Sequence, residues 1–355
     1  MSAAPLVSVI VAAFDAERTL SETLRSALAQ TWRNIEIIIV DDGSNDGTAV
    51  IAESFAAADP RVIVLRQPNR GVSQARNAGI ARSKGDWIAP LDADDVWHPE
   101  KLARQLEAAR RAATPPGFVY SFFRRIDQAG VIVGSGGPYR VGGRAIHRHL
   151  FRNFVGNGSS VLMRRDAVIE VGGYDERVTR SEDYILQIAI ALRHPIECVP
   201  EYLVGYRITP GSKTSDREAM FEAWCVLLPI LRASRPPGAG RVALRWAHGK
   251  RCLDMAEYWA ARRHYRSSIA LLGRAAIADP AWTMLNVAYW LGRGLRRHAA
   301  SAPRAAEGPV AFIGAPTEIL IARDSREAPQ RTSWLRRLEA RRFEKLAARD
   351  RRLGP

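Results

Sequence analysis

The first hundred residues alternate between short apolar runs, which predict buried strands, and segments with apolar residues every three to four positions, which predict helices. The predicted strands cover 7–13, 35–40, 62–65 and 87–91, and the predicted helices cover 16–30, 48–57, 72–83 and 99–111. We expect Pro99 to open the last helix, because proline favours the first helical position. This order predicts an α/β fold with a mostly parallel central sheet flanked by helices.

The pattern changes after residue 111. The glycine-rich stretch 120–141 predicts strand and hairpin structure. Residues 216–297 predict a helical region, in which 249–282 has the spacing of one tetratricopeptide-type helical hairpin. Residues 299–316 have the composition of a linker, and 334–353 predict a basic amphipathic helix. The apolar side of that helix comprises Leu335, Leu338, Phe343 and Leu346.

The distribution of charged residues supports the same division of the chain. We assign residues 1–215 to one domain, 216–297 to the helical region, and 298–355 to a basic linker and amphipathic tail. The formal net charge is +15, from 52 Lys and Arg against 37 Asp and Glu. The first domain carries 26 basic and 24 acidic side chains, so most of the excess lies behind residue 215. The charge therefore bears on where the protein works more than on its chemistry.

The basic tail has three interpretations. It could lie on an anionic membrane surface, bind a partner, or form a solvated, partly disordered extension. No nucleic-acid motif accompanies the charge, which argues against nucleic acid as a partner.

The cysteines and apolar runs indicate a cytoplasmic protein. Cys198, Cys225 and Cys252 are isolated, so neither a zinc ribbon nor a thioredoxin-type site is supported. A sparse, odd number of cysteines fits a reducing compartment. We expect neither a signal peptide nor a transmembrane helix, because the apolar runs are too short.

Acidic residues follow two of the predicted strands. Asp41 and Asp42 come after the second strand, and Asp92, Asp94 and Asp95 come after the fourth. The carboxyl ends of parallel strands meet at one edge of a sheet, where ligands bind. Carboxylates gathered there repel one another unless a cation such as Mg²⁺ or Mn²⁺ lies between them, together with a phosphate-bearing ligand. The alternative is that these residues cap helices or remain solvated.

A glycine-containing loop lies between the two acidic clusters. In residues 69–79, the glycines allow tight turns and the helix start offers unpaired N–H groups. Arg76, one turn into that helix, could reach a phosphate or a base, or could form a structural ion pair.

Four segments in this order resemble inverting glycosyltransferase family 2, which has the GT-A fold built on a Rossmann-like sheet. They read VSVIVAAFDAERTLSETLRSALAQTW, IEIIIVDDGSNDGT, NRGVSQARNAGIARSKGDWIAPLDADD and GGYDE…SEDYILQIAI. The resemblance covers about residues 5–215. It implies a donor site for a nucleotide-diphosphate sugar, with a UDP-sugar favoured. The implied donor contacts are Ala12, Phe14, Asp41, Asp42, Arg76, Asp92 and Ala93.

The resemblance also implies the catalytic groups. Asp94, with Asp92, would hold the divalent metal, whereas Asp95 could instead cap the helix near Pro99. Asp183 would be the general base that activates the acceptor hydroxyl, and Glu182 would help to orient the site. The alternative for Asp183 is a carboxylate stabilised by the helix dipole.

Two departures from the family pattern matter. Thr209 stands where relatives commonly carry a histidine, so water, Ser212, His147 or His149 would have to complete the metal shell. Each of these histidines has the simpler interpretation of a surface residue. The chain also lacks the QxxRW segment of processive synthases, which predicts transfer of a single sugar.

The predicted acceptor is a glycan or lipid-linked molecule of surface polysaccharide or glycoconjugate synthesis. A nucleotidyltransferase is one alternative, but it would need a catalytic Lys or Arg in the loop after the first strand, and residues 12–17 have neither. A non-catalytic sugar-binding or scaffold protein of the same fold is the other.

Overall fold

The computed structural model describes residues 4–136, 139–178, 180–208, 217–234, 240–294 and 334–354. The strands are β1 (Val7–Ala13), β2 (Ile35–Asp41), β3 (Val62–Arg66), β4 (Trp87–Asp92), β5 (Val96–Trp97), β6 (Phe118–Ile126), β7 (Ile132–Ser135), β8 (Val161–Arg164) and β9 (Ile196–Arg207). The helices of the first domain are α1 (Leu20–Leu28), α2 (Thr48–Ala58), α3 (Val72–Arg82), α4 (Lys101–Arg111), α5 (Ile146–Phe151), α6 (Arg165–Glu170) and α7 (Glu182–Ala191), with a 3₁₀ turn at Gly158–Ser160. The later helices are α8 (Arg217–Ala233), α9 (Gly240–Ala261), α10 (Tyr265–Ala278), α11 (Pro280–Gly294) and α13 (Trp334–Arg351).

The described strands form one sheet in the order β3-β2-β1-β4-β8-β6-β9-β5, with β7 paired to β6. The pairs among β1 to β4 are parallel, whereas β8 runs antiparallel to both β4 and β6. The α/β prediction is confirmed, as is the β6–β7 hairpin. The expectation for Pro99 is wrong, because α4 begins at Lys101 and the Pro99 carbonyl instead accepts a hydrogen bond from the backbone N–H of Thr31.

Side chains of the parallel strands are buried on both faces of the sheet. In β1, Val9 and Val11 pack on the same face as Leu24 of α1, while Ile10 packs on the other face with Ala75 of α3. This alternation explains why these strands are mostly apolar, since a strand covered by helices on both sides has no solvent-facing position. The exceptions in β1 and β2 pair with each other, because the Ser8 hydroxyl donates to the Glu36 carboxylate at 2.6 Å. The arrangement leaves the strand ends as the place where polar groups gather.

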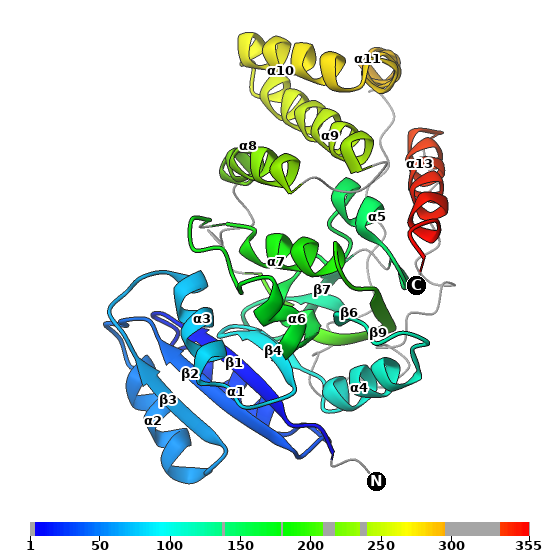
Figure 1. Cartoon of the computed structure of the whole chain (residues 1–355). Coiled ribbons are helices and arrows are strands. Elements are labelled where there is room, and N and C mark those ends of the chain that lie inside the picture. The colour runs from blue at the N-terminus through cyan, green and yellow to red at the C-terminus, as the bar shows by residue number, and fades with distance from the viewer. Residues whose placement is uncertain are drawn as a thin grey trace.

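Helices α8 to α11 stack beyond α5 and α7 (Figure 1). α9 and α10 form a helical hairpin with Ala256 and Ala275 in its buried interior, and the tetratricopeptide-type spacing of 249–282 stays a prediction. Gly249 allows the close approach of these helices, because a Cβ there would lie 3.1 Å from the Cβ of Asp279. Among the described residues, no helix is long and apolar enough to cross a membrane.

Helix α13 runs beside α5 (Figure 1) and docks on the first domain. Leu346 is fully buried, and Phe343 packs against Tyr139 and Phe154. The apolar side of this helix therefore faces protein, and the solvated-extension interpretation does not hold for residues 334–354.

A fully buried carboxylate anchors α13. Asp350 accepts hydrogen bonds from the backbone N–H of His147 at 2.8 Å and from Nε of Arg148 at 2.7 Å. The Nδ1 atom of His147 lies 2.9 Å from the same carboxylate. A buried charge needs such partners, because burial removes its hydration.

Replacing Asp350 with alanine should destabilise the protein by about 3 kcal/mol, because the buried His147 and the largely buried Arg148 lose their shared carboxylate partner. Thermal and urea unfolding of the full chain would measure the loss. Glu344→Ala, at an exposed position of the same helix, is the matched control and should leave the transition unchanged. Equal transitions for the two variants would contradict the anchoring role of Asp350.

Candidate active site

The two acidic loops meet at the carboxyl edge of the parallel strands, as the strand order predicted. Asp41 ends β2 opposite Ala13 of β1, and Asp92 ends β4 opposite Ala12. The two carboxylates thus flank the end of β1. Phe14 follows directly, and 46% of its surface is exposed, so its ring is accessible.

Asp42 shapes the start of α3. Its buried carboxylate accepts hydrogen bonds from the backbone N–H groups of Arg70 at 3.0 Å and Gly71 at 2.8 Å. The side chain of Gln67 donates a third at 2.7 Å. Gly71 adopts a φ of 91°, which favours glycine, and α3 begins at the next residue.

Arg76 joins the two predicted halves of the site. Its side chain is only 5% exposed and donates to Asp92 at 2.5 Å and to Glu182 at 2.7 Å. Burial alone lowers the pKa of Arg76, but the charges of Asp92 and its neighbours raise that pKa well above the ordinary value. Of the alternatives for Arg76, the structure contains the ion pair, and the predicted contact with a nucleotide stays a prediction.

The turn before α7 is bound to α3 through Asn77. The Asn77 side chain donates to the carbonyl of Tyr174 and accepts from its N–H, both at 2.9 Å. Gly173 allows this approach, because a Cβ there would lie 2.7 Å from the Asn77 side-chain oxygen and the φ of 74° favours glycine. The start of α7 is therefore held next to α3.

Asp94 lies in an electrostatically unfavourable position. Burial and the charge of Asp92 raise the pKa of its carboxyl to about 6. Within the described part of the chain, no neighbouring residue donates a hydrogen bond to this carboxylate. The turn that carries it is fixed, because the Ala93 carbonyl accepts from the hydroxyls of Thr19 at 2.9 Å and Thr23 at 3.0 Å.

Asp95 does not cap a helix. It is fully buried and accepts from the Ser159 hydroxyl at 2.6 Å and from the backbone N–H of Arg207 at 3.0 Å. Burial raises its pKa well above the ordinary value, and the charges of Asp94 and Asp92 raise it further. The capping alternative is therefore wrong, because the carboxyl is consumed in a buried network with β9.

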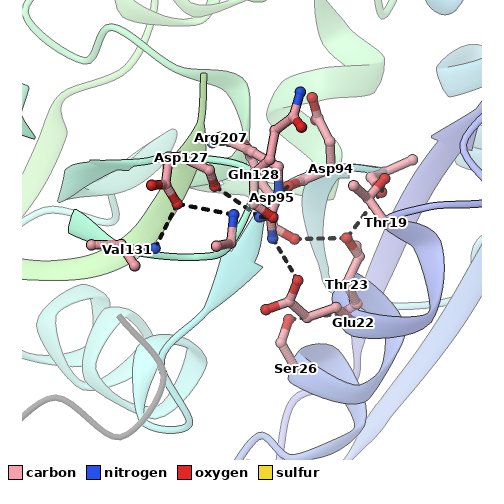
Figure 2. Close-up of polar contacts among 12 residues, drawn as sticks. Thr19, Glu22, Thr23, Ser26, Asp94, Asp95, Asp127, Gln128, Val131 and Arg207 are labelled. Carbon is pink, nitrogen blue, oxygen red and sulfur yellow. Dashed lines mark hydrogen bonds and ion pairs between the residues drawn. The ribbon is translucent and has the colours of Figure 1, made fainter. Parts of the chain in front are cut away.

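Arg207, at the end of β9, is a site residue that the sequence analysis missed. Figure 2 shows its guanidinium reaching Glu22 of α1, at 2.6 Å, and the carbonyl of Asp94, at 2.8 Å. It also donates to the carbonyls of Asp127 and Gln128 at 2.9 Å. No strand was predicted over 196–207, so the available signal was limited to a basic residue two positions before Thr209, where the family pattern places a histidine.

The predicted base opens α7. Burial and the neighbouring charge of Glu182 raise the pKa of Asp183 to about 7. Ser181, just before it, has a left-handed φ of 60°, which is uncommon for a residue with a side chain and clusters at functional sites. Gly158 faces this position, since a Cβ there would lie 3.7 Å from the Cβ of Asp183 and from Arg76.

The two histidines considered for the metal shell lie elsewhere. His147 and His149 are buried, which corrects their interpretation as surface residues. His149 packs against Phe154 and Tyr184, and burial lowers its pKa to about 3. Thr209 and Ser212 lie outside the described residues. Among the described residues, no three His, Cys, Asp or Glu side chains are grouped to hold a metal ion.

Residues 8–172 match the family model "Glycosyl transferase family 2". These residues form a glycosyltransferase family 2 domain. The succinoglycan biosynthesis protein ExoO of Rhizobium meliloti is 33% identical over 220 residues, which cover 57% of this chain and 60% of that protein. The chain spans about a third to two thirds of the length of the first curated relatives it matches.

Solved glycosyltransferases share the fold. Residues 1–349 of S. aureus TarS in complex with UDP-GlcNAc align with a TM-score of 0.59 and 16% identity, covering 78% of this chain and 82% of that one. The mannosyltransferase PcManGT from Pyrobaculum calidifontis, in complex with GDP-Man and Mn²⁺, aligns at 0.56 with 18% identity, covering 83% and 82%. The GT-A fold predicted for this family 2 domain is confirmed.

Asp94→Asn should stabilise the metal-free family 2 domain at neutral pH. The Asp94 carboxyl keeps its proton to about pH 6 in the folded chain and to about pH 4 when unfolded. Its stabilising contribution is therefore complete below about pH 4 and is lost as the pH rises through 6. Unfolding in EDTA at pH 7.5 should show a gain of about 1–3 kcal/mol that vanishes near pH 4. Asp254→Asn, at an exposed position, is the control, and an equal effect of both variants would contradict the prediction.

Proposed function

We propose that this glycosyltransferase transfers a single sugar from a nucleotide-diphosphate sugar to an acceptor hydroxyl, with inversion at the anomeric carbon. The observation that carries the proposal is the buried Arg76. It pairs with Asp92, a predicted donor contact, and with Glu182, which precedes the predicted general base Asp183. These ion pairs bring the two predicted sets of functional carboxylates into one cluster.

The donor is expected at the end of β1. Ala12 and Phe14, together with the loop of Asp41 and Asp42, would contact the nucleotide base of the donor. The accessible Phe14 ring suits stacking on a pyrimidine. Asp92 and Ala93 would lie near the ribose and the first phosphate. A UDP-sugar is favoured, and the UDP-GlcNAc in the TarS complex supports this class, whereas PcManGT was solved with GDP-Man.

A divalent cation, Mg²⁺ or Mn²⁺, fits the residues present. Asp94, with Asp92, would hold it, because the Asp94 carboxylate has no donor among its described neighbours and a raised pKa that a cation would offset. The Mn²⁺ in the PcManGT complex supports metal use in this fold. Such a cation would neutralise the diphosphate leaving group.

Asp183 would act as the general base. As the acceptor oxygen forms its bond to the anomeric carbon and the bond to the diphosphate breaks, the hydroxyl proton passes to the Asp183 carboxylate. A pKa of about 7 suits that transfer at neutral pH. Glu182, held by Arg76, would keep the start of α7 oriented.

The acceptor is proposed to be a glycan or lipid-linked molecule of surface polysaccharide or glycoconjugate synthesis. The names of ExoO and of Escherichia coli chondroitin synthase, which is 27% identical over 216 residues, support this class. Peripheral contact with an anionic membrane at the cytoplasmic face would use the exposed basic side of α13 rather than its packed apolar side. The basic side consists of Arg337, Arg341, Lys345 and Arg349.

Binding of the nucleotide part of the donor should require the divalent metal and should depend on which base the nucleotide carries. With Mn²⁺, a nucleoside diphosphate should raise the melting temperature, and a screen of UDP, GDP and dTDP would identify the base. Asp94→Ala should abolish the shift and the slow metal-dependent hydrolysis of the donor, while Asp254→Ala should retain both. Absence of a metal-dependent shift with every nucleotide would exclude the proposed function.

Sugar transfer should require Asp183, whereas donor binding should not. Asp183→Asn should keep the nucleotide-dependent thermal shift but lower transfer by about 10²–10⁴-fold, because no carboxylate accepts the proton. In the parent protein, kcat should rise with pH up to about 7, as the Asp183 carboxyl loses its own proton. A transfer rate in Asp183→Asn close to that of the parent would assign the base elsewhere.

A further inference from the structure

A cavity of about 330 Å³ lies between α8, α9 and α10, outside the first domain. None of the residues assigned to donor, metal or base lines it. It is open to solvent, because its three arginines and Ile277 are exposed, and its volume is at the lower end of that of small-molecule sites. The lining residues are Arg232, Arg245, His248, Arg274, Ile277 and Ala278.

The lining is strongly cationic. Three helices each contribute an arginine, and no acidic side chain lines the cavity. Among the described residues, Arg232 and Arg274 have no ion-pair or hydrogen-bond partner, and Arg245 donates only to the Ala278 carbonyl at 3.3 Å. All three arginines are solvent-exposed. Water therefore screens their mutual repulsion, and an anion would bind by pairing with several guanidinium groups at once.

His248 supplies a neutral, oriented polar ring beside these charges. The Trp224 indole N–H donates to Nδ1 of His248 at 3.2 Å, which places the ring proton on Nε2. Arg251 stacks over Trp224 at 3.8 Å and fixes the indole in turn. Burial lowers the pKa of His248, and the charges of Arg232 and Arg274 lower it further, so the ring is uncharged at neutral pH.

We propose that this cavity is a second ligand site, which binds a phosphate-bearing anion through Arg232, Arg245 and Arg274. Guanidinium groups match phosphate oxygens with paired N–H donors, and three of them suit a diphosphate or a doubly charged phosphate ester. The volume leaves room for a group attached to the phosphate. Ile277, which is 82% exposed at the rim, offers that group an apolar surface.

The test uses the full chain in EDTA, which removes metal from the donor site. Inorganic pyrophosphate is titrated calorimetrically at about 0.15 M salt, where diffuse surface attraction is screened. Arg232→Gln combined with Arg274→Gln should weaken binding at least about tenfold, the effect of losing a charge-assisted hydrogen bond. Arg241→Gln with Arg266→Gln removes the same charge from exposed positions of α9 and α10 outside the cavity, and should leave binding unchanged.

A second arm distinguishes a lipid headgroup from a soluble ligand. If the phosphate belongs to a lipid, the parent protein should co-sediment with phosphatidylglycerol vesicles but not with phosphatidylcholine vesicles. The Arg232→Gln/Arg274→Gln cavity variant should lose this binding, and the Arg241→Gln/Arg266→Gln control should keep it. Pyrophosphate binding without vesicle binding identifies a soluble phosphate ligand. Binding of neither probe, or equal losses in both double variants, would overturn the proposal. The cavity variant should keep its Mn²⁺-dependent nucleotide shift, so failure here is separable from failure of the transferase function.

Discussion

The structure depends on holding several carboxylates together at one edge of a sheet. Asp92, Asp94 and Asp95 follow a single strand, and burial removes the water that would otherwise screen their mutual repulsion. Two buried arginines make this arrangement possible. Arg76 neutralises Asp92. The Arg207 side chain donates to the Asp94 carbonyl, and its backbone N–H donates to the Asp95 carboxylate, so among the described residues the Asp94 carboxylate receives no hydrogen bond from a neighbouring residue.

The two arginines also decide which parts of the chain meet. Arg76 lies on α3 and ties β4 to the start of α7, 106 residues further along. Arg207 lies at the end of β9 and ties α1 to the turn between β6 and β7. Because each guanidinium has several donors in a fixed plane, each can fix several elements at once, which a lysine could not do. The site geometry is therefore a consequence of long-range ion pairs more than of loop conformation.

Sequence reasoning succeeded where the signal was local. The parallel strands and their helices follow from apolar periodicity, and the placement of Asp41 and Asp92 on either side of the β1 end follows from strand order. It failed for Asp95 and Arg207, because a buried polar network is set by which distant strands pair, and the pairing of β6, β8 and β9 has no short-range signature. The apolar side of α13 was visible, but periodicity does not say whether a membrane or protein covers it.

The docking of α13 links the basic end of the chain to the catalytic domain. Asp350 holds α5 through His147 and Arg148, and the next residue of α5, His149, accepts a 2.6 Å hydrogen bond at its carbonyl from the Tyr184 hydroxyl. Tyr184 follows Asp183 directly. A continuous set of buried contacts thus connects the C-terminal helix to the start of the helix that carries the proposed base. The basic side of α13 is therefore fixed relative to the site, and it would meet any anionic surface at a defined orientation.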